Sequence, residues 1–141
     1  MEVAVEKTQQ AHSETAVSAL QKAFAFDRDG QEFQAIEYYK KALSMGLKGD
    51  DLLSAHVCLG SSYRAIGEYE KAKYILLEGL FHFPQSTALK TFLYLVQYNR
   101  EQAKDAVEGL LKLLVDTTRD KEILKYKTAL NNYAKNLDRQ F

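Results

Sequence analysis

Hydrophobic residues recur every three or four positions along most of this chain, which is the spacing that places side chains on one face of an α-helix. Between Tyr69 and Phe83 they form a single apolar stripe, and Gly67 interrupts the pattern just before that stripe begins. A glycine at such a position favours a tight reversal of the chain. Pro84 cannot continue a helix and therefore closes the segment. Residues 59–84 are thus predicted to form two antiparallel helices.

The same pattern occurs before and after this segment. Ala35 and Ala42 lie 37 residues before Ala72 and Gly79, and Ala106 lies 34 residues after Ala72. A recurring period of this length is typical of helical-repeat proteins, in which each helix pair buries its apolar face against the next pair. We therefore predict three helix pairs of similar construction.

The remaining residues flank these repeats. Residues 1–12 are polar and are expected to form an N-terminal arm, and residues 119–141 are expected to form one capping helix. An apolar stripe runs along that capping helix, with lysine and arginine on its other side, and consists of Ile123, Tyr126, Leu130, Tyr133 and Leu137. The repeats between the two flanks, which together span 13–118, are expected at about 13–47, 51–84 and 86–118. A terminal helix with a polar outer surface would shield the last repeat from water.

The predicted helix starts carry capping residues. Ser86 or Thr87 can accept hydrogen bonds from the first amides of the helix that follows Pro84. Thr117 and Asp120 have the three-residue spacing of a capping box and are expected to begin the terminal helix.

Several residues of the segment 59–84 carry a family resemblance. The Leu59-Gly60 pair, Tyr63, Ala72 and Pro84 have the spacing of the tetratricopeptide repeat signature, which this segment resembles. His56 stands where that family usually has Trp and is expected to pack within its helix. The resemblance implies an all-α right-handed superhelix of three antiparallel helix-turn-helix repeats plus a C-terminal capping helix.

Charge and cysteine content limit the classes of partner and compartment. The chain has 19 basic and 19 acidic residues, so it lacks the positive charge expected of a protein that binds nucleic acid or a membrane surface. No apolar run is long enough to span a bilayer. Because Cys58 is the only cysteine, an internal disulfide is excluded, and a reducing, cytoplasmic location is expected.

The sequence offers little that indicates catalysis. The three histidines, His12, His56 and His82, do not have the spacing of metal ligands, and one cysteine cannot complete a structural zinc site. Glycine-rich phosphate loops and serine nucleophile motifs are also missing. Cys58 could act as a nucleophile beside a histidine, but burial as a small hydrophobic residue is the commoner role. We expect no catalytic residues, no metal and no cofactor.

The resemblance places the first helix of each repeat on an inner groove that holds a partner segment. The expected groove residues are Val57, Ser61, Arg64, Thr91, Leu95 and Tyr98. The carboxylate clamp known in the family would fall on Cys58, Ala88 and Phe92, none of which can hold a carboxylate. The groove is therefore predicted to prefer an apolar or aromatic anchor. The alternative is that these residues pack against the terminal helix or the N-terminal arm.

The function predicted from these observations is a non-catalytic protein-protein interaction module, a scaffold or adaptor. It would bind a protein or peptide segment, or a second copy of itself as a homodimer, because much apolar surface is left for a short array to cover. The alternative is an RNA-binding helical-repeat protein that reads bases with the same inner helices. The neutral net charge disfavours this alternative.

Overall fold

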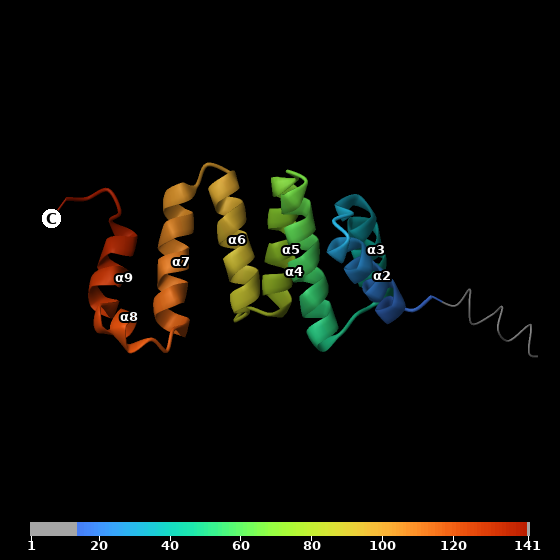
Figure 1. Cartoon of the computed structure of the whole chain (residues 1–141), viewed down its shortest axis with the longest axis horizontal. Helices are drawn as coiled ribbons and strands as arrows, with labels where there is room; N and C mark the ends of the chain where they lie inside the picture. The colour runs from blue at the N-terminus through green and yellow to red at the C-terminus, as the bar shows by residue number, and fades with distance from the viewer. Residues whose placement is uncertain (1–13, 141) are drawn as a thin grey trace, which may run out of the picture. The chain divides into compact units, whose positions relative to one another are not determined.

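The computed structural model describes residues 14–140, and all the regular secondary structure in this range is α-helical (Figure 1). The arm expected at residues 1–12 lies outside the described residues. The helices are α2 (Ala16–Arg28), α3 (Glu32–Met45), α4 (Gly49–Ala65), α5 (Tyr69–His82), α6 (Thr87–Asn99), α7 (Ala103–Thr117), α8 (Lys121–Lys125) and α9 (Lys127–Lys135). The prediction of an all-α helical-repeat fold is confirmed.

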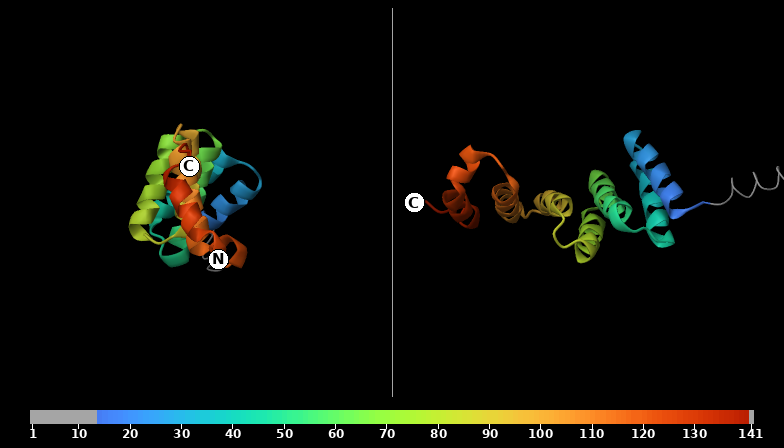
Figure 2. Two further views of the ribbon diagram at one scale, coloured as in Figure 1. Left: turned by 90° about the vertical axis from the view of Figure 1, so that its left-hand side faces the viewer. Right: turned by 90° about the horizontal axis from the view of Figure 1, so that it is seen from below.

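The described chain divides into two compact units, residues 14–75 and residues 76–140, so that α5 contributes residues to both. In the first unit, α2 packs against α3 and α3 packs against α4 (Figure 2). In the second unit, α6 packs against α7, which in turn packs against α9. In each unit, the helices that pack together most extensively are consecutive in sequence, except that α9 packs on α7 across the short helix α8.

Small side chains line the helix contacts of the first unit. Its buried cluster contains five alanines that are fully inaccessible to water, Ala19, Ala23, Ala35, Ala42 and Ala55. Larger apolar residues, such as Leu20 and Leu59, fill the space beside them, and each contributes about 1.5 to 3 kcal/mol by leaving water. Ala72 of α5, a residue of the repeat signature, is also fully buried.

The first helix of each pair ends at a residue with left-handed backbone conformation. These residues are Gly30 (φ +72°), Gly67 (φ +80°) and Glu101 (φ +62°). At each end, two amides donate back to the last helical turn, which is the Schellman arrangement. The pairs of bonds are Gly30 N to Asp27 O (3.0 Å) with Gln31 N to Phe26 O (2.9 Å), Gly67 N to Arg64 O (3.0 Å) with Glu68 N to Tyr63 O (2.9 Å), and Glu101 N to Tyr98 O (3.2 Å) with Gln102 N to Gln97 O (2.9 Å).

The C-terminal segment differs from the single helix that the sequence predicted. Tyr126 interrupts it, since its amide donates to Ile123 O, three residues back, at 3.0 Å, which is a tighter turn than that of an α-helix. The interruption lets α9 have its own axis, and α9 packs on α7 with Ala134 buried. The capping box expected from Thr117 was also wrong. Thr117 ends α7 and donates its hydroxyl to Leu113 O, while Asp120 caps α8 by accepting from Glu122 N at 2.9 Å.

Glu101 provides a test of the left-handed turn. A non-glycine residue in this conformation costs roughly 1 to 2 kcal/mol, so Glu101→Gly should raise the free energy of unfolding by about 1 kcal/mol in denaturant titrations. Gly67→Ala, where an added Cβ would meet no atom within 4 Å, should lower it by a similar amount through backbone strain alone. A Glu101→Gly variant no more stable than Glu101→Ala would contradict this account.

Gly109 of α7 provides a second test, at the contact with α6. A Cβ atom added to Gly109 would overlap the ring of Tyr94. Gly109→Ala should therefore lower the free energy of unfolding by roughly 1 to 3 kcal/mol, although alanine normally stabilises a helix relative to glycine. In a Tyr94→Ala background the same change should become neutral or stabilising. If Gly109→Ala stabilised the protein in both backgrounds, the proposed close contact would be wrong.

Candidate functional site

The expected groove residues of the first unit share one face of α4. Val57, Ser61 and Arg64 are spaced four and three residues apart, and each is half-buried. The opposite face of α4 is the packed one and contains Ala55, His56, Leu59, Gly60 and Ser62. The three predicted residues therefore lie on the part of α4 that water can reach.

The expected groove residues of the second unit share one face of α6 in the same way. Thr91 and Leu95 are half-buried, while Tyr98 is 62% exposed. Leu89 and Val96 are buried on the other side of the helix. The Thr91 hydroxyl donates to Thr87 O at 2.7 Å, so this hydrogen bond stays within the helix. The α6 row thus presents an aromatic ring beside an aliphatic side chain.

The α4 row belongs to the first unit and the α6 row to the second. The channel that the sequence predicts between them stays a prediction. What the structure describes is two separate helix faces, each partly open to water, whose residues are the ones expected from the repeat register.

The surroundings of His56 and Cys58 indicate that both residues have a structural role. His56 is 2% exposed, and its Nδ1 lies 2.9 Å from Leu52 O of the same helix, as expected for a residue that packs within the repeat. Burial raises the pKa of the half-buried Cys58 thiol, which keeps it protonated and unreactive at neutral pH. His12 lies outside the described residues.

A buried polar contact joins α2 and α3 near Cys58. The Tyr39 hydroxyl donates to Asp27 Oδ2 at 2.7 Å, and the Tyr39 ring meets Phe24 edge-on at 6.0 Å between centroids. Burial, followed by the hydrogen bond to Asp27, raises the pKa of Tyr39 far above its ordinary value. A phenol that stays protonated and bonded in this way holds helices together and is unsuited to acid-base catalysis.

Within residues 14–140, no group of three or more His, Cys, Asp or Glu side chains could hold a metal ion. Across the same range, none of the helices combines the length and the apolar character needed to cross a bilayer.

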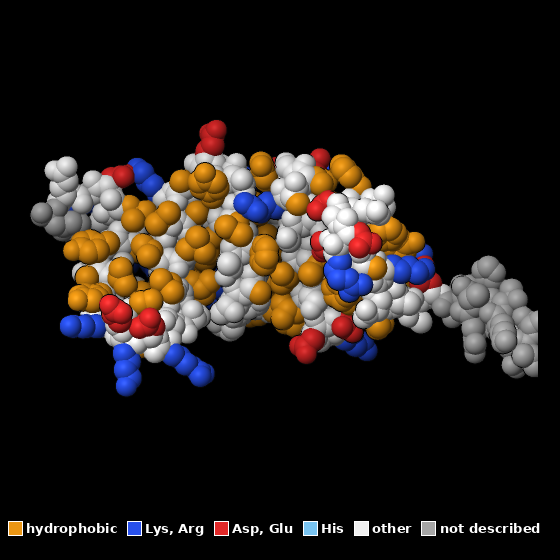
Figure 3. Space-filling view, in the orientation of Figure 1, with side chains coloured by type: hydrophobic (Ala, Val, Ile, Leu, Met, Phe, Trp, Pro, Cys, Tyr) orange, Lys and Arg blue, Asp and Glu red, His pale blue; other side chains and the backbone are white. Residues whose placement is uncertain are grey.

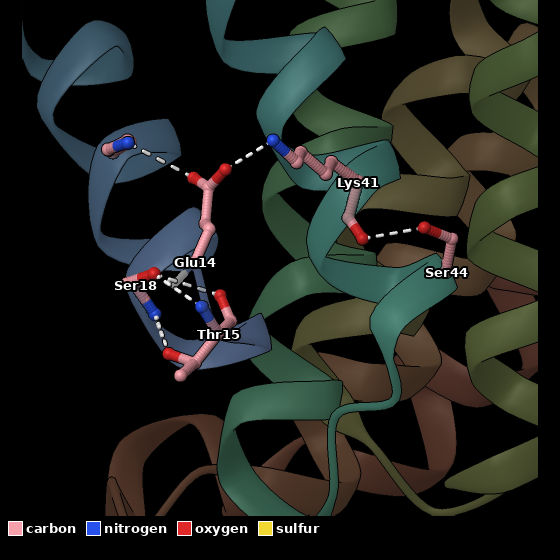
Figure 4. Close-up of polar contacts among 6 residues, drawn as sticks. Glu14, Thr15, Ser18, Lys41 and Ser44 are labelled. Carbon is pink, nitrogen blue, oxygen red and sulfur yellow. Dashed lines mark hydrogen bonds and ion pairs between the residues drawn. The ribbon is translucent and has the colours of Figure 1, made fainter. Parts of the chain in front are cut away.

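A charged cluster that the sequence did not predict lies at the start of α2 (Figure 4). Glu14 accepts from Lys22 Nζ at 3.1 Å through one carboxylate oxygen and pairs with Lys41 of α3 through the other. Both lysine ammonium groups also lie near the Tyr38 ring, at 5.6 and 5.9 Å from its centroid. The cluster connects the residue preceding the N-cap of α2 to the C-terminal half of α3, and Lys41 and Lys22 lower the pKa of Glu14.

Large exposed apolar side chains occur outside the predicted groove as well. On α5, Tyr74 is 69% and Phe81 is 84% exposed. In the second unit, hydrophobic side chains gather over α7, α8 and α9 on the face shown in Figure 3. In the second unit, the exposed large apolar side chains from α7 onward are Val107, Leu114, Leu124, Tyr126, Tyr133 and Leu137. Exposed patches of this kind mark candidate interaction surfaces.

The Glu14 cluster makes the stability of the fold pH-dependent. Because the folded-state pKa of Glu14 lies below its ordinary value of 4.5, its stabilising contribution is present above that value and is lost as the pH falls through the folded-state pKa. Glu14→Gln should therefore lower the melting temperature at pH 7, and the difference from wild type should shrink as the pH falls below 4.5. Glu37→Gln, which removes an exposed pair with Lys40 alone, is the matched control and should change little at either pH. An equal deficit for Glu14→Gln at all pH values would exclude a charge effect.

Comparison with known proteins identifies the family of the chain. The family model described as Tetratrico peptide repeat matches residues 16–137. A comparison with curated proteins found no match. Because the family match spans most of the chain, including both units and the terminal helices, this protein belongs to the tetratricopeptide repeat family.

Proposed function

We propose that this protein is a non-catalytic interaction module, a scaffold or adaptor, that binds a partner segment through the predicted groove faces of α4 and α6. Tetratricopeptide repeats generally mediate protein-protein interaction. The observation that carries the proposal is the α6 face, where the ring of Tyr98 is 62% exposed beside half-buried Leu95. An aromatic residue in this position can supply a large contact area at small entropic cost.

The partner is proposed to insert an aliphatic or aromatic side chain against Leu95 and Tyr98 of α6, and to make a separate apolar contact with Val57 on α4. Arg64 would fix the register of the segment through a carboxylate or a backbone carbonyl, since its guanidinium can donate two parallel hydrogen bonds. Ser61 and Thr91 would line the remaining contact. This arrangement gives the apolar anchor most of the affinity and gives Arg64 a role in specificity.

A carboxylate clamp of the kind known in the family is not part of this proposal. Its positions fall on Cys58, Ala88 and Phe92. The Cys58 thiol stays neutral because burial raises its pKa, and the other two side chains are apolar. Recognition would therefore depend on side chains along the partner segment rather than on its C-terminus.

The partner segment could belong to a second copy of the chain, and we include a cytoplasmic homodimer in the proposal. The exposed apolar side chains support self-association, because a partner that covers them would remove them from water. A single cysteine with a protonated thiol suits a reducing compartment. Light scattering at tens of micromolar should give a mass of two 16.1 kDa chains, and a mass of one chain would exclude the dimer.

The groove proposal is tested by Tyr98→Ala. This change should weaken binding of a partner purified with the wild-type chain by roughly 2 kcal/mol, or dissociate the homodimer, because it removes a desolvated anchor. Calorimetry and a melting curve for each variant separate lost binding from lost folding. Tyr74→Ala, which removes an equally exposed tyrosine on α5, is the matched control and should bind normally.

Arg64→Ala completes the comparison, because it should reduce the salt dependence and the selectivity of binding more than its strength. If Tyr98→Ala bound as tightly as wild type, or lost binding only through unfolding, the groove mechanism would be wrong.

A further inference from the structure

The outer side of the terminal helix differs from the polar cap that the sequence predicted. Helix α9 packs on α7 with Ala134 buried and Leu130 half-buried. On another side, Tyr126, which immediately precedes α9, is 54% exposed, and Tyr133 of α9 is 50% exposed, with half-buried Ala129 between them. Polar side chains at these two positions would shield the end of the repeats equally well. A helix that served only as a cap would therefore not need the two aromatic rings.

The two rings border a shallow depression. It has a volume of about 470 Å³ and is lined by Lys125, Tyr126, Thr128, Ala129, Asn132 and Tyr133. The small side chain of Ala129 lies between the aromatic walls. The Lys125 ammonium lies 5.7 Å from the centroid of the Tyr126 ring, so one end of the depression carries a positive charge. The lining thus combines two aromatic rings, polar side chains and one cation.

The seven-residue spacing of the two tyrosines corresponds to the repeat of a polyproline II segment. Tyr126 is the residue before α9, and its carbonyl accepts the first helical hydrogen bond from Leu130 N at 2.9 Å. Seven residues of an α-helix rise about 10 Å, which is therefore the expected axial separation of the backbone at Tyr126 and Tyr133. A polyproline II segment has three residues per turn and rises about 9 Å over them, so its residues i and i+3 project from one side at nearly the same separation. Grooves lined by aromatic rings are the usual docking sites for such segments, because the segment is already extended and loses little entropy on binding.

The charge of the C-terminal segment indicates the charge of its ligand. Residues 119–140 contain six lysines and arginines and three aspartates and glutamates, a net charge of +3 in a chain whose total charge is zero. One of the three acidic residues, Asp138, is paired with Lys104 of α7. A ligand with acidic residues beside its apolar positions complements this distribution.

We propose that the depression between Tyr126 and Tyr133 is a docking site for an acidic, proline-containing segment of a partner protein. Prolines at positions i and i+3 of that segment contact the two rings, with the backbone of the segment over Ala129. An acidic flanking residue pairs with Lys125. The site uses neither the α4 face nor the α6 face, so it goes beyond the function proposed above and can fail independently of it.

An extended segment suits this site better than a second copy of α9. Helix α9 has nine residues, so its length is about 13 Å. A stable protein-protein interface buries roughly 1,200 to 2,000 Å² in total. A symmetric pair of such short helices buries a smaller area than this. A short peptide needs only the two rings and the cation, and its affinity is correspondingly modest.

The proposal is tested by calorimetric titration of the full chain with a blocked octapeptide, acetyl-EEPALPEE-amide, whose prolines are three residues apart. Two matched peptides serve as controls. The first, EEAPPLEE, has the same composition with adjacent prolines, and the second, KKPALPKK, has the opposite charge. Acetyl-EEPALPEE-amide should bind saturably, and each of the two control peptides should bind at least about tenfold more weakly.

Variants identify the surface that the peptide uses. Tyr133→Ala should weaken binding at least about tenfold, in line with the loss of an aromatic anchor. Ala129→Leu, which fills the depression while keeping a good helix former, should do the same, and Lys125→Glu should weaken binding in a salt-dependent way. Tyr98→Ala and Tyr74→Ala remove exposed tyrosines elsewhere and should bind as wild type. Melting curves check that every variant is folded.

Amide chemical shifts locate the contact directly. On peptide addition, ¹⁵N-labelled protein should show its largest shift changes between residues 125 and 133. Absence of saturable binding at millimolar peptide, or equal binding by folded Tyr133→Ala, would overturn the proposal. Shift changes confined to α4 and α6 would also overturn it and would support the groove instead. A dimer that Tyr133→Ala dissociates would show that a second copy covers this face, and would overturn the peptide assignment.

Discussion

The arrangement of each helix pair depends on one residue that takes a left-handed backbone conformation. At Gly30, Gly67 and Glu101 the same two amides donate back to the preceding turn, and the next helix begins two residues later in each case. Because both hydrogen bonds are fixed by local geometry, the reversal has the same form each time. The second helix of each pair therefore starts in a defined register, and its small residues can meet the first helix.

Much of this arrangement could be predicted from the sequence. The helical period gave the element type, and Gly67 and Pro84 marked the boundaries of the central pair, since both residues act through backbone conformation. Ser86 caps α6 as expected, accepting from Leu89 N at 3.2 Å. The left-handed conformation of Glu101 could not be predicted in this way, because glutamate has no intrinsic preference for left-handed backbone. Its conformation follows from the hydrogen bonds around it and from the packing of α6 on α7.

The candidate sites also differ in how far they could be predicted from the sequence. Rows such as Val57, Ser61 and Arg64 follow from helical period alone, so the shared faces on α4 and α6 could be predicted from their spacing. The Glu14 cluster joins residues 27 positions apart, and nothing local to Glu14 indicates Lys41 as its partner. The exposure of Tyr126 and Tyr133 depends on how α9 is rotated against α7. That rotation follows from the interruption at Tyr126, which has no clear signal in the residue pattern.

The interruption at Tyr126 also affects local stability. Helices as short as α8 and α9, with five and nine residues, do not persist alone in water, because nucleation costs more than so few hydrogen bonds return. The order of this segment therefore comes from its contact with α7. Its amide protons can exchange with solvent through a local opening that leaves α6 and α7 folded, whereas the buried helices of the first unit require a larger opening. The C-terminal end of this repeat protein thus has a folding equilibrium of its own.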